Sequence, residues 1–320
     1  MKITGIIRLA AVAFAALFLS AAAGSAQTYP NQRVTIVVPF GAGSVTDILA
    51  RIFANEMSTR WGQQVIVENK PGLSGTAAVA KAPPDGYTLM VTSNGHTVSA
   101  LVAKNVPFDP VKDFSGITRL GSPPLFLISY PGNGAKDLKG LLALAKEKAG
   151  KMNFSSAGLA STTGIAGLLF RKTAGVDITH VPYKSAPDAV TAVIRGDADV
   201  YFAPVNLAKE MAEGGKVVAI AAATTQRIPD LPDVPTFTEQ GLPFVYDSWF
   251  GLLAPAGVPK DILNKIAADW AAALKTPDMQ AKLKAQFVIA ASDQPDDLDK
   301  IIAKETANLT EVFKDINISQ

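Results

Sequence analysis

Short runs of β-branched and other apolar residues alternate along this chain with longer segments of helical periodicity. Residues 33–39 (RVTIVVP) are typical of a buried strand, and residues 46–60 place apolar side chains at the spacing of one helix face. Strands that alternate with helices indicate an α/β fold with mostly parallel sheets. The 320 residues suffice for two domains, but periodicity does not decide between one sheet and two. Further strands are expected at 64–68, 87–92, 117–130 with a break at Pro123 and Pro124, 153–156, 178–183, 198–203 and 217–223, and further helices at 138–148, 163–173, 187–195, 207–213, 262–274 and 298–313.

The first 26 residues have the layout of a secretory signal peptide. Lys2 and Arg8 precede an apolar run over 9–23, and three small residues at 24–26 (GSA) follow it. The run is shorter than the roughly 20 residues that span a bilayer as a helix, which disfavours the alternative of a transmembrane anchor. No cysteine follows it, so lipid attachment there is excluded. We expect cleavage after about Ala26 and export to the periplasm, with secretion to the medium as the alternative.

Charge and composition exclude several classes of function. The chain has 30 Lys and Arg against 28 Asp and Glu, and two of these bases lie in residues 1–26, so the remainder is formally neutral. It therefore lacks the basic footprint of a nucleic-acid-binding protein. The absence of cysteine excludes disulfides, thiolate zinc sites and cysteine nucleophiles. Only two histidines are present, which leaves little material for a metal site or a catalytic triad, and we expect neither metal nor cofactor.

A glycine-rich loop joins the first expected strand to the first expected helix. It reads PFGAGSVTD over 39–47, with Ser44 and Thr46 as candidate caps and hydroxyl donors. Free N–H groups at a helix start, together with the helix dipole, favour an anion. A dinucleotide fingerprint would need glycine at position 46, and a phosphate loop would need Gly-Lys-Ser/Thr, so neither motif is present. The loop is therefore interpreted as an anion cradle, and a plain turn with structural glycines is the alternative.

A second loop of the same kind follows the strand at 153–156. It reads SSAGLASTTG over 155–164 and places Ser161, Thr162 and Thr163 at the start of a helix. An ordinary serine or threonine cap is the alternative interpretation. Two such loops, one from each half of the chain, could close on one small anion from opposite sides.

Other polar residues follow strands and have both functional and structural interpretations. His96, after the third strand, is a candidate site residue or a surface histidine. Tyr183 could cover a ligand, and Lys184 could attract an acid or simply be solvated. Asp197 and Asp199 flank Ala198 before a strand and are not interpreted as an acid–base couple; one of them could hold a loop or reach a polar group of a ligand. His180, within an apolar strand, is interpreted as structural.

A secreted α/β serine hydrolase is the rival hypothesis to a binding protein. Ser44 or Ser161 would be its nucleophile and His96 its base, although no G-x-S-x-G elbow is present. A serine–histidine hydrogen bond with an acid behind the histidine would favour this rival. Two lobes with both helix-start loops facing one cleft would favour a receptor.

Several short motifs occur in one order between Tyr29 and the C-terminus. They are Tyr29-Pro30, Pro39-Phe40 with Gly43 and Asp47, VENKPG at 67–72, PDGYTL at 84–89, VPYK at 181–184, DVPT at 233–236 and WFGLLAPAGVP at 249–259. Together they resemble the motifs of the Bug family, the extracytoplasmic substrate-binding proteins of tripartite tricarboxylate transporters.

The resemblance implies a fold and a site. The fold would be a type II periplasmic-binding-protein fold with two α/β lobes, a ligand cleft and two crossovers, with the signal peptide at 1–26, lobe 1 at 27–125 and 251–320, and lobe 2 at 126–250. The chain would cross between the lobes near 125–130 and 249–255. The helix-start loops would grip a ligand carboxylate. The site residues carried over are Phe40, Gly41, Ala42, Gly43, Ser44, Asp47, Ser93, Asn94, His96, Ser161, Thr162, Thr163, Tyr183, Lys184 and Asp199.

The resemblance also implies a partner. We expect a monomeric, non-enzymatic receptor that delivers a small carboxylate to a membrane permease of the tripartite tricarboxylate type or to a sensor kinase. The sequence departs from the family pattern at five positions in its loops, which bears on ligand preference: Ser44 and Ser185 replace glycine, Ala160 replaces the glycine before Ser161, and Gly164-Ile165 replaces His-Leu.

Overall fold

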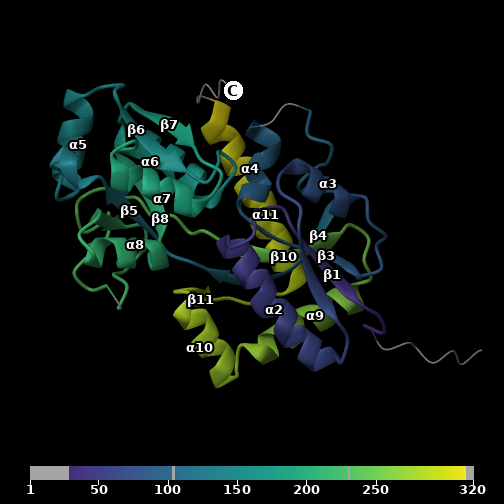
Figure 1. Cartoon of the computed structure of the whole chain (residues 1–320). Helices are drawn as coiled ribbons and strands as arrows, with labels where there is room; N and C mark the ends of the chain where they lie inside the picture. Colours follow the sequence, from purple (N-terminus) through teal and green to yellow (C-terminus); the bar gives the residue numbers. More distant parts are fainter. Residues whose placement is uncertain (1–28, 103–104, 230, 315–320) are drawn as a thin grey trace, which may run out of the picture.

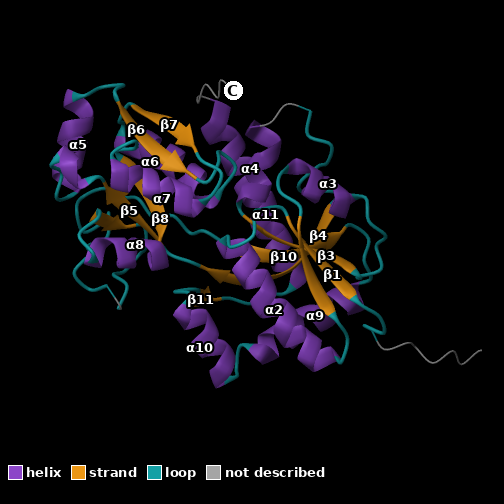
Figure 2. Ribbon diagram, viewed as in Figure 1, coloured by secondary structure: helices purple, strands orange, loops and turns teal. Residues whose placement is uncertain are grey.

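The computed structural model describes residues 29–102, 105–229 and 231–314, and the strands form two separate sheets (Figures 1 and 2). The expected signal peptide lies outside the described residues. The first sheet has the order β11-β4-β10-β3-β1-β2, and the second has the order β7-β6-β8-β5-β9. Figure 1 shows the second sheet with its teal and green helices beside the first sheet, which purple, blue and yellow helices cover.

The first sheet combines strands from both ends of the chain. Its strands are β1 (Val34–Val38), β2 (Val65–Asn69), β3 (Thr88–Ser93), β4 (Phe114–Ser122), β10 (Phe250–Pro255) and β11 (Ile289–Ala290). Its helices are α2 (Val45–Trp61), α3 (Leu73–Ala80), α4 (Gly95–Val102), α9 (Lys260–Ala273), α10 (Pro277–Ala285) and α11 (Pro295–Lys314).

The second sheet is built from the middle of the chain. Its strands are β5 (Leu125–Ser129), β6 (Met152–Ser156), β7 (Ile178–Pro182), β8 (Val200–Pro204) and β9 (Val218–Ala222). Its helices are the short 3₁₀ helix η1 (Pro131–Asn133), α5 (Leu138–Glu147), α6 (Thr162–Ala174), α7 (Ala186–Arg195) and α8 (Val205–Glu213).

Both sheets are mixed, whereas the sequence pattern predicts mostly parallel ones. Strands joined through a helix run parallel, as β1 does to β2 and β3, with Ile36 opposite Val67 and Leu89. The strands that carry the chain between the sheets run the other way. β10 is antiparallel to β3 and β4, and β5 is antiparallel to β8 and β9. The α/β class is confirmed, and the antiparallel pairs are those of β5 and β10, through which the chain enters each sheet, together with the pair of β11 and β4.

Two short crossings connect the sheets and are bonded to each other. The first is Pro123 with Pro124, between β4 and β5, and the second ends at Ser248 just before β10. The Ser248 hydroxyl donates to the carbonyl of Pro123 at 3.0 Å, and the Ser122 hydroxyl donates to the carbonyl of Ser248. The segments 125–130 and 249–255, predicted as crossings, instead begin or form the strands that follow them.

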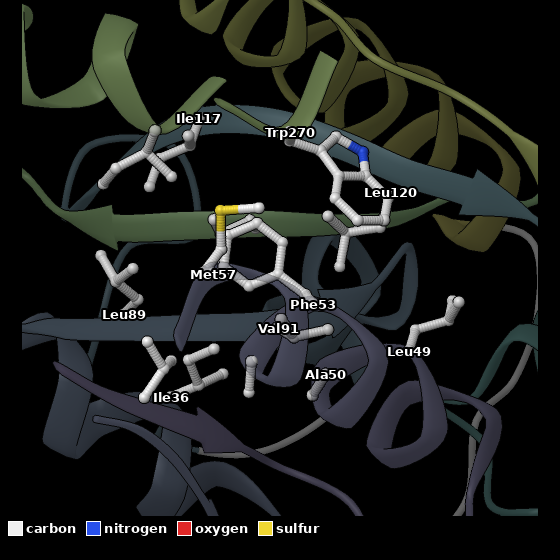
Figure 3. Packing of buried hydrophobic residues seen from close by; sticks show 14 of the residues in the cluster. Ile36, Leu49, Ala50, Phe53, Met57, Leu89, Val91, Ile117, Leu120 and Trp270 are labelled. Carbon is white, nitrogen blue, oxygen red and sulfur yellow. The ribbon is translucent and has the colours of Figure 1, made fainter. Parts of the chain in front are cut away.

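Each sheet has its own hydrophobic core. Figure 3 shows the first, where Phe53 and Met57 of α2 lie against the sheet and near Trp270 of α9. The ring centroids of Phe53 and Trp270 are 5.5 Å apart. The second core contains a cluster of phenylalanines with neighbouring ring centroids 5.0–6.0 Å apart: Phe170, Phe202, Phe237 and Phe244.

The C-terminal helix α11 contacts both lobes. Leu298, near its start, is fully buried in a cluster beside the first sheet, whereas Leu309, near its end, belongs to the core of the second. Figure 1 shows this helix in yellow, passing from the first sheet to the side of the second. None of the helices within the described residues combines the length and hydropathy needed to cross a bilayer.

Candidate functional site

The first glycine-rich loop ends in a capped helix start. Ser44 is the N-cap of α2, and its Oγ accepts a hydrogen bond from the Asp47 N–H at 3.2 Å. Gly43 has φ +78, a left-handed conformation that favours glycine, and its N–H donates to the Asp47 carboxylate at 2.9 Å. These bonds hold the loop in one conformation above the carboxyl end of β1.

Asp47 supports this loop from behind. Its buried carboxylate accepts hydrogen bonds from Asn69 at 3.0 Å and from Arg51, whose guanidinium approaches to 2.9 Å. Asn69 also donates to the carbonyl of Phe40 at 3.2 Å. Burial alone would raise the pKa of Asp47, but the hydrogen bonds from Arg51, Gly43 and Asn69 lower it below its ordinary value. Asp47 does not line the cavity described below.

The second loop is built in the same way at the start of α6. The Ser161 Oγ accepts from the Gly164 N–H at 3.1 Å and donates to the carbonyl of Gly158 at 2.6 Å. The Thr163 hydroxyl accepts from the Ala157 N–H at 3.1 Å. A Cβ added at Gly164 would lie 2.4 Å from the Gly158 oxygen, so this tight loop requires glycine at that position.

Both helix starts leave backbone donors free. Among the described residues, no acceptor bonds the N–H groups of Val45 and Thr46 in α2 or of Thr162 and Thr163 in α6. All four residues line one cavity of about 250 Å³ between the two sheets. Helix dipoles place partial positive charge at both starts. The cavity thus receives the anion-binding ends of two helices, one from each sheet.

The cavity wall carries little formal charge. Among the described residues that line it, none is Asp or Glu, and the one charged side chain is Lys184, which is exposed. A cavity with free amides and no carboxylate suits a small anion and disfavours a cation. No described cluster of His, Asp and Glu is arranged to hold a metal ion.

The structure brings most of the predicted site residues to this cavity. Ser93, at the end of β3, and Lys184, just before α7, join the two loops there. The lining set that the sequence predicts is Phe40, Gly41, Ala42, Gly43, Ser44, Ser93, Ser161, Thr162, Thr163 and Lys184.

Asn94 lies between the sheets and outside the cavity wall. The Thr162 hydroxyl donates to its side-chain oxygen at 3.0 Å, which links α6 directly to the first lobe. The Asn94 amide nitrogen donates to the hydroxyl of Tyr246 and, at 3.3 Å, to Glu305 of α11. Asn94 therefore bridges the lobes through buried polar contacts.

His96 is enclosed by apolar rings. It borders a neighbouring cavity of about 370 Å³, but its ring is 3% exposed and its Nε2 lies 2.8 Å from the carbonyl oxygen of Pro110. The Phe114 ring stands edge-on to it at 4.7 Å. Burial lowers the pKa of His96 to about 4, so the ring is neutral at ordinary pH.

The structure does not bring Tyr183 or Asp199 to the cavity. Tyr183 packs against a core cluster of the second sheet. Asp199 precedes β8, whereas Pro204, at the opposite end of that strand, lines the cavity. The Asp199 carboxylate accepts from the Asn153 N–H at 2.8 Å and so joins two strand ends.

Sequence reasoning missed several apolar residues of the wall. Ile48 belongs to the helical pattern at 46–60, and Leu207 begins the helix expected at 207–213; both line the cavity. Phe250, at the start of β10, also lines it. No local signal distinguishes these side chains from core residues, because the cavity exists only where the two lobes meet.

The geometry does not support a serine hydrolase. Among the described contacts, neither Ser44 nor Ser161 bonds a histidine. One serine–histidine contact is present elsewhere, between Ser156 Oγ and His180 Nε2 at 2.7 Å. No described carboxylate bonds the His180 ring; burial first, and then the charge of Arg171, lower its pKa to about 4. The acid that a triad needs is absent there.

Two α/β lobes joined by short crossings, with a ligand-sized cavity at their junction, define a periplasmic-binding-protein fold. Residues 49–318 match the family described as the tripartite tricarboxylate transporter family receptor, and the chain belongs to this family. A similar curated relative is the "UPF0065 protein in tcbD-tcbE intergenic region" of Pseudomonas sp. strain P51. It is 33% identical over 303 residues, which cover 93% of this chain and 90% of the relative. The protein is accordingly a binding protein and not an enzyme.

Solved structures of similar proteins share the fold. The periplasmic binding protein BugD superposes with a TM-score of 0.81 at 29% identity, over 91% of this chain and 99% of that one. MatC from Rhodopseudomonas palustris, solved with bound malate, has a TM-score of 0.81 at 32% identity and covers 89% and 99%. Rpa4515 of R. palustris, solved with adipate, has a TM-score of 0.82 at 29% identity and covers 89% and 97%.

Proposed function

We propose that this protein is a periplasmic receptor that binds a small carboxylated molecule between its lobes. The observation that carries the proposal is the convergence of four unbonded backbone N–H groups, from two helix starts, on a cavity whose described wall has no acidic side chain. Such groups suit a carboxylate without a positively charged partner. The malate and adipate bound by two relatives support the same ligand class.

The proposed site residues divide into those that contact the ligand and those that support the site. The loop residues from Phe40 to Ser44, with Ser93, Ser161–Thr163 and Lys184, surround the ligand. Asp47 and Asn94 act through other groups, because the first holds the α2 loop and the second bridges the lobes.

The lobes are proposed to be 27–125 with 251–320, and 126–250. The strand content of the two sheets supports this division, since one sheet takes β1–β4 with β10 and β11 and the other takes β5–β9. Closure of the lobes would bury the ligand and present a surface to the partner. Family membership supports a permease of the tripartite tricarboxylate type as that partner, with a sensor kinase as the alternative, and the receptor would act as a monomer.

A comparison of acids with their primary amides tests the proposal. Adipate and hexanoate would be titrated calorimetrically against adipamide and hexanamide, which match them in shape and lack the charge. We expect the acids to bind at least tenfold more tightly, because hydrogen bonds to a charged acceptor contribute about 1.5–3 kcal/mol against about 1 kcal/mol for neutral ones. Equal affinity for an acid and its amide would contradict a carboxylate site.

A further inference from the structure

Two large apolar side chains face the cavity from opposite lobes. Ile48 projects from the first turn of α2, and Leu207 from the first turn of α8. Both are half-buried, and neither belongs to any hydrophobic cluster formed by the described residues. Neither side chain therefore packs within a hydrophobic core.

Neighbours on the same helices behave differently. In α2, Leu49 is buried in the first core, and the half-buried Ile52 packs against it. In α8, Val205 is buried in a second-lobe cluster, and Met211 packs against that cluster. A single exposed apolar residue needs no explanation, but two that face one cavity from separate sheets do.

The wall around these two side chains is mostly apolar. Ala186 and Pro187, at the start of α7, and Pro204, at the end of β8, line the same cavity. The Ser185 hydroxyl donates to the Asp188 carboxylate at 2.7 Å, which leaves the Asn206 amide, beside Leu207, as the polar side chain available there. A ligand body with several hydroxyl groups would lose more hydrogen bonds to water than this one amide could replace.

We infer that the ligand is a carboxylate with an apolar body, alkyl or aryl, held between Ile48 and Leu207. This inference rests on the proposed function, since the helix starts would hold the carboxylate. An apolar body would remove both side chains from water, which is favourable in proportion to the area covered. We expect polyhydroxylated acids of the same length to bind more weakly, because most of their hydroxyl groups would be buried without a hydrogen-bond partner.

Pairs of acids with one carbon skeleton test the inference. Hexanoate and gluconate share a six-carbon monocarboxylate chain, and adipate and galactarate share a six-carbon dicarboxylate chain. Calorimetric titration of the purified protein should give at least tenfold tighter binding for hexanoate and adipate. Equal or tighter binding of gluconate and galactarate would overturn the inference and leave the carboxylate site intact. Failure of all four acids to bind would overturn the proposed function and this inference with it.

Substitutions at the two side chains give a second measurement. Leu207→Asn keeps the branching and the number of side-chain heavy atoms, and Ile48→Thr keeps the β-branch with one heavy atom fewer; both add polar atoms. We expect each to weaken hexanoate binding about tenfold and to reduce its preference over gluconate. Leu207→Met, which stays apolar, should retain the preference and keeps the test available if the asparagine variant does not fold. Val111→Thr, at a 39% exposed side chain outside the cavity wall, is the matched control. Unchanged hexanoate affinity in folded Leu207→Asn and Ile48→Thr would overturn the inference.

Discussion

Ser44 and Ser161, two of the helix-cap serines that line the cavity, differ in the hydrogen bonds that their hydroxyl groups make. Ser161 donates its hydroxyl hydrogen to the carbonyl of Gly158 at 2.6 Å, so that hydrogen is used within its own loop. The Ser44 oxygen accepts from the Asp47 N–H, and no described acceptor takes its hydrogen. Ser44, one of the departures from the family pattern, can therefore donate to a ligand and also narrows the cavity.

Replacing Ser44 with glycine should broaden the range of acids that bind. Glycine removes the side chain from the cavity wall and keeps an acceptable N-cap, so the free energy of unfolding should fall by only a few tenths of a kcal/mol. Melting temperatures of both proteins over one panel of acids would measure the effect. Thr276→Gly, at the N-cap of α10, is the control for loss of a cap alone. An unchanged rank order of acids would remove Ser44 from the site.

We expect Asp47 to stabilise the loop before α2, although its side chain does not line the cavity. Asp47→Ala leaves the Gly43 N–H and Asn69 without their acceptor and should lower the free energy of unfolding by about 1–3 kcal/mol. Because the folded state lowers the pKa of Asp47, its stabilising contribution is present above the unfolded value of about 3.9 and is lost as the pH falls through the lower folded value. The free energy of unfolding, measured with urea from pH 6 to pH 2.5, should therefore fall less in Asp47→Ala than in the wild type. An equal fall in both proteins would contradict this role.

At the scale of elements, α11 carries a half-buried acid, Glu305, to the junction of the lobes. Glu305 accepts from the indole N–H of Trp249 at 2.7 Å and from Asn94 at 3.3 Å. Burial raises its pKa to about 7, although hydrogen bonds from Trp249, Asn94 and Thr97 oppose the shift; Asp247 raises it further. The protonated form of Glu305 is therefore stabilised in the folded protein.

This shift predicts a pH dependence of stability. The contribution of Glu305 to the free energy of unfolding is fully present below its unfolded pKa of about 4.3. It is lost as the pH rises through its folded pKa of about 7. Glu305→Gln keeps a neutral side chain and should reduce the fall in melting temperature between pH 5 and pH 8. Glu147→Gln, at an exposed position on α5, is the control. A pH profile identical to that of the wild type would contradict the assignment.

Local patterns predicted the helix-start loops well, since capping and glycine geometry are encoded within a few residues. They did not predict α3 and α4, two short helices that contain Gly75 and Gly95. Gly75 is required by a local approach, because a Cβ there would lie 2.0 Å from the Lys70 oxygen, and Gly95 is required by a tertiary one, because a Cβ there would lie 1.8 Å from the Ala160 oxygen. Ile48 and Leu207 escaped notice for a related reason, because their role depends on the opposite lobe. Local sequence patterns do not show contacts between residues that lie far apart in the chain.

At the scale of the whole molecule, Gly95 sets how closely the lobes approach. It lies at the start of α4 in the first lobe, and the Ala160 carbonyl belongs to the α6 loop in the second. Gly95→Ala cannot keep the observed distance and should hold the lobes apart. A penalty of about 1.4 kcal/mol on the closed arrangement would weaken ligand binding about tenfold.

Small-angle X-ray scattering with calorimetry would measure this effect. We expect a larger radius of gyration for Gly95→Ala in the presence of adipate than for the wild type, and weaker binding. Gly214→Ala, where the nearest atom to the added Cβ is 3.4 Å away, is the control. An unaltered radius and affinity would show that this approach does not limit closure.

A crystal structure with adipate or hexanoate bound tests the central claim most directly. The claim is that backbone N–H groups at two helix starts, one in each lobe, hold the ligand carboxylate. We expect its oxygens within about 3.2 Å of amide nitrogens, or of waters bonded to them, at Val45 or Thr46 and at Thr162 or Thr163. The body of the acid should lie between Ile48 and Leu207. A carboxylate paired with Lys184 and remote from both helix starts would contradict the account.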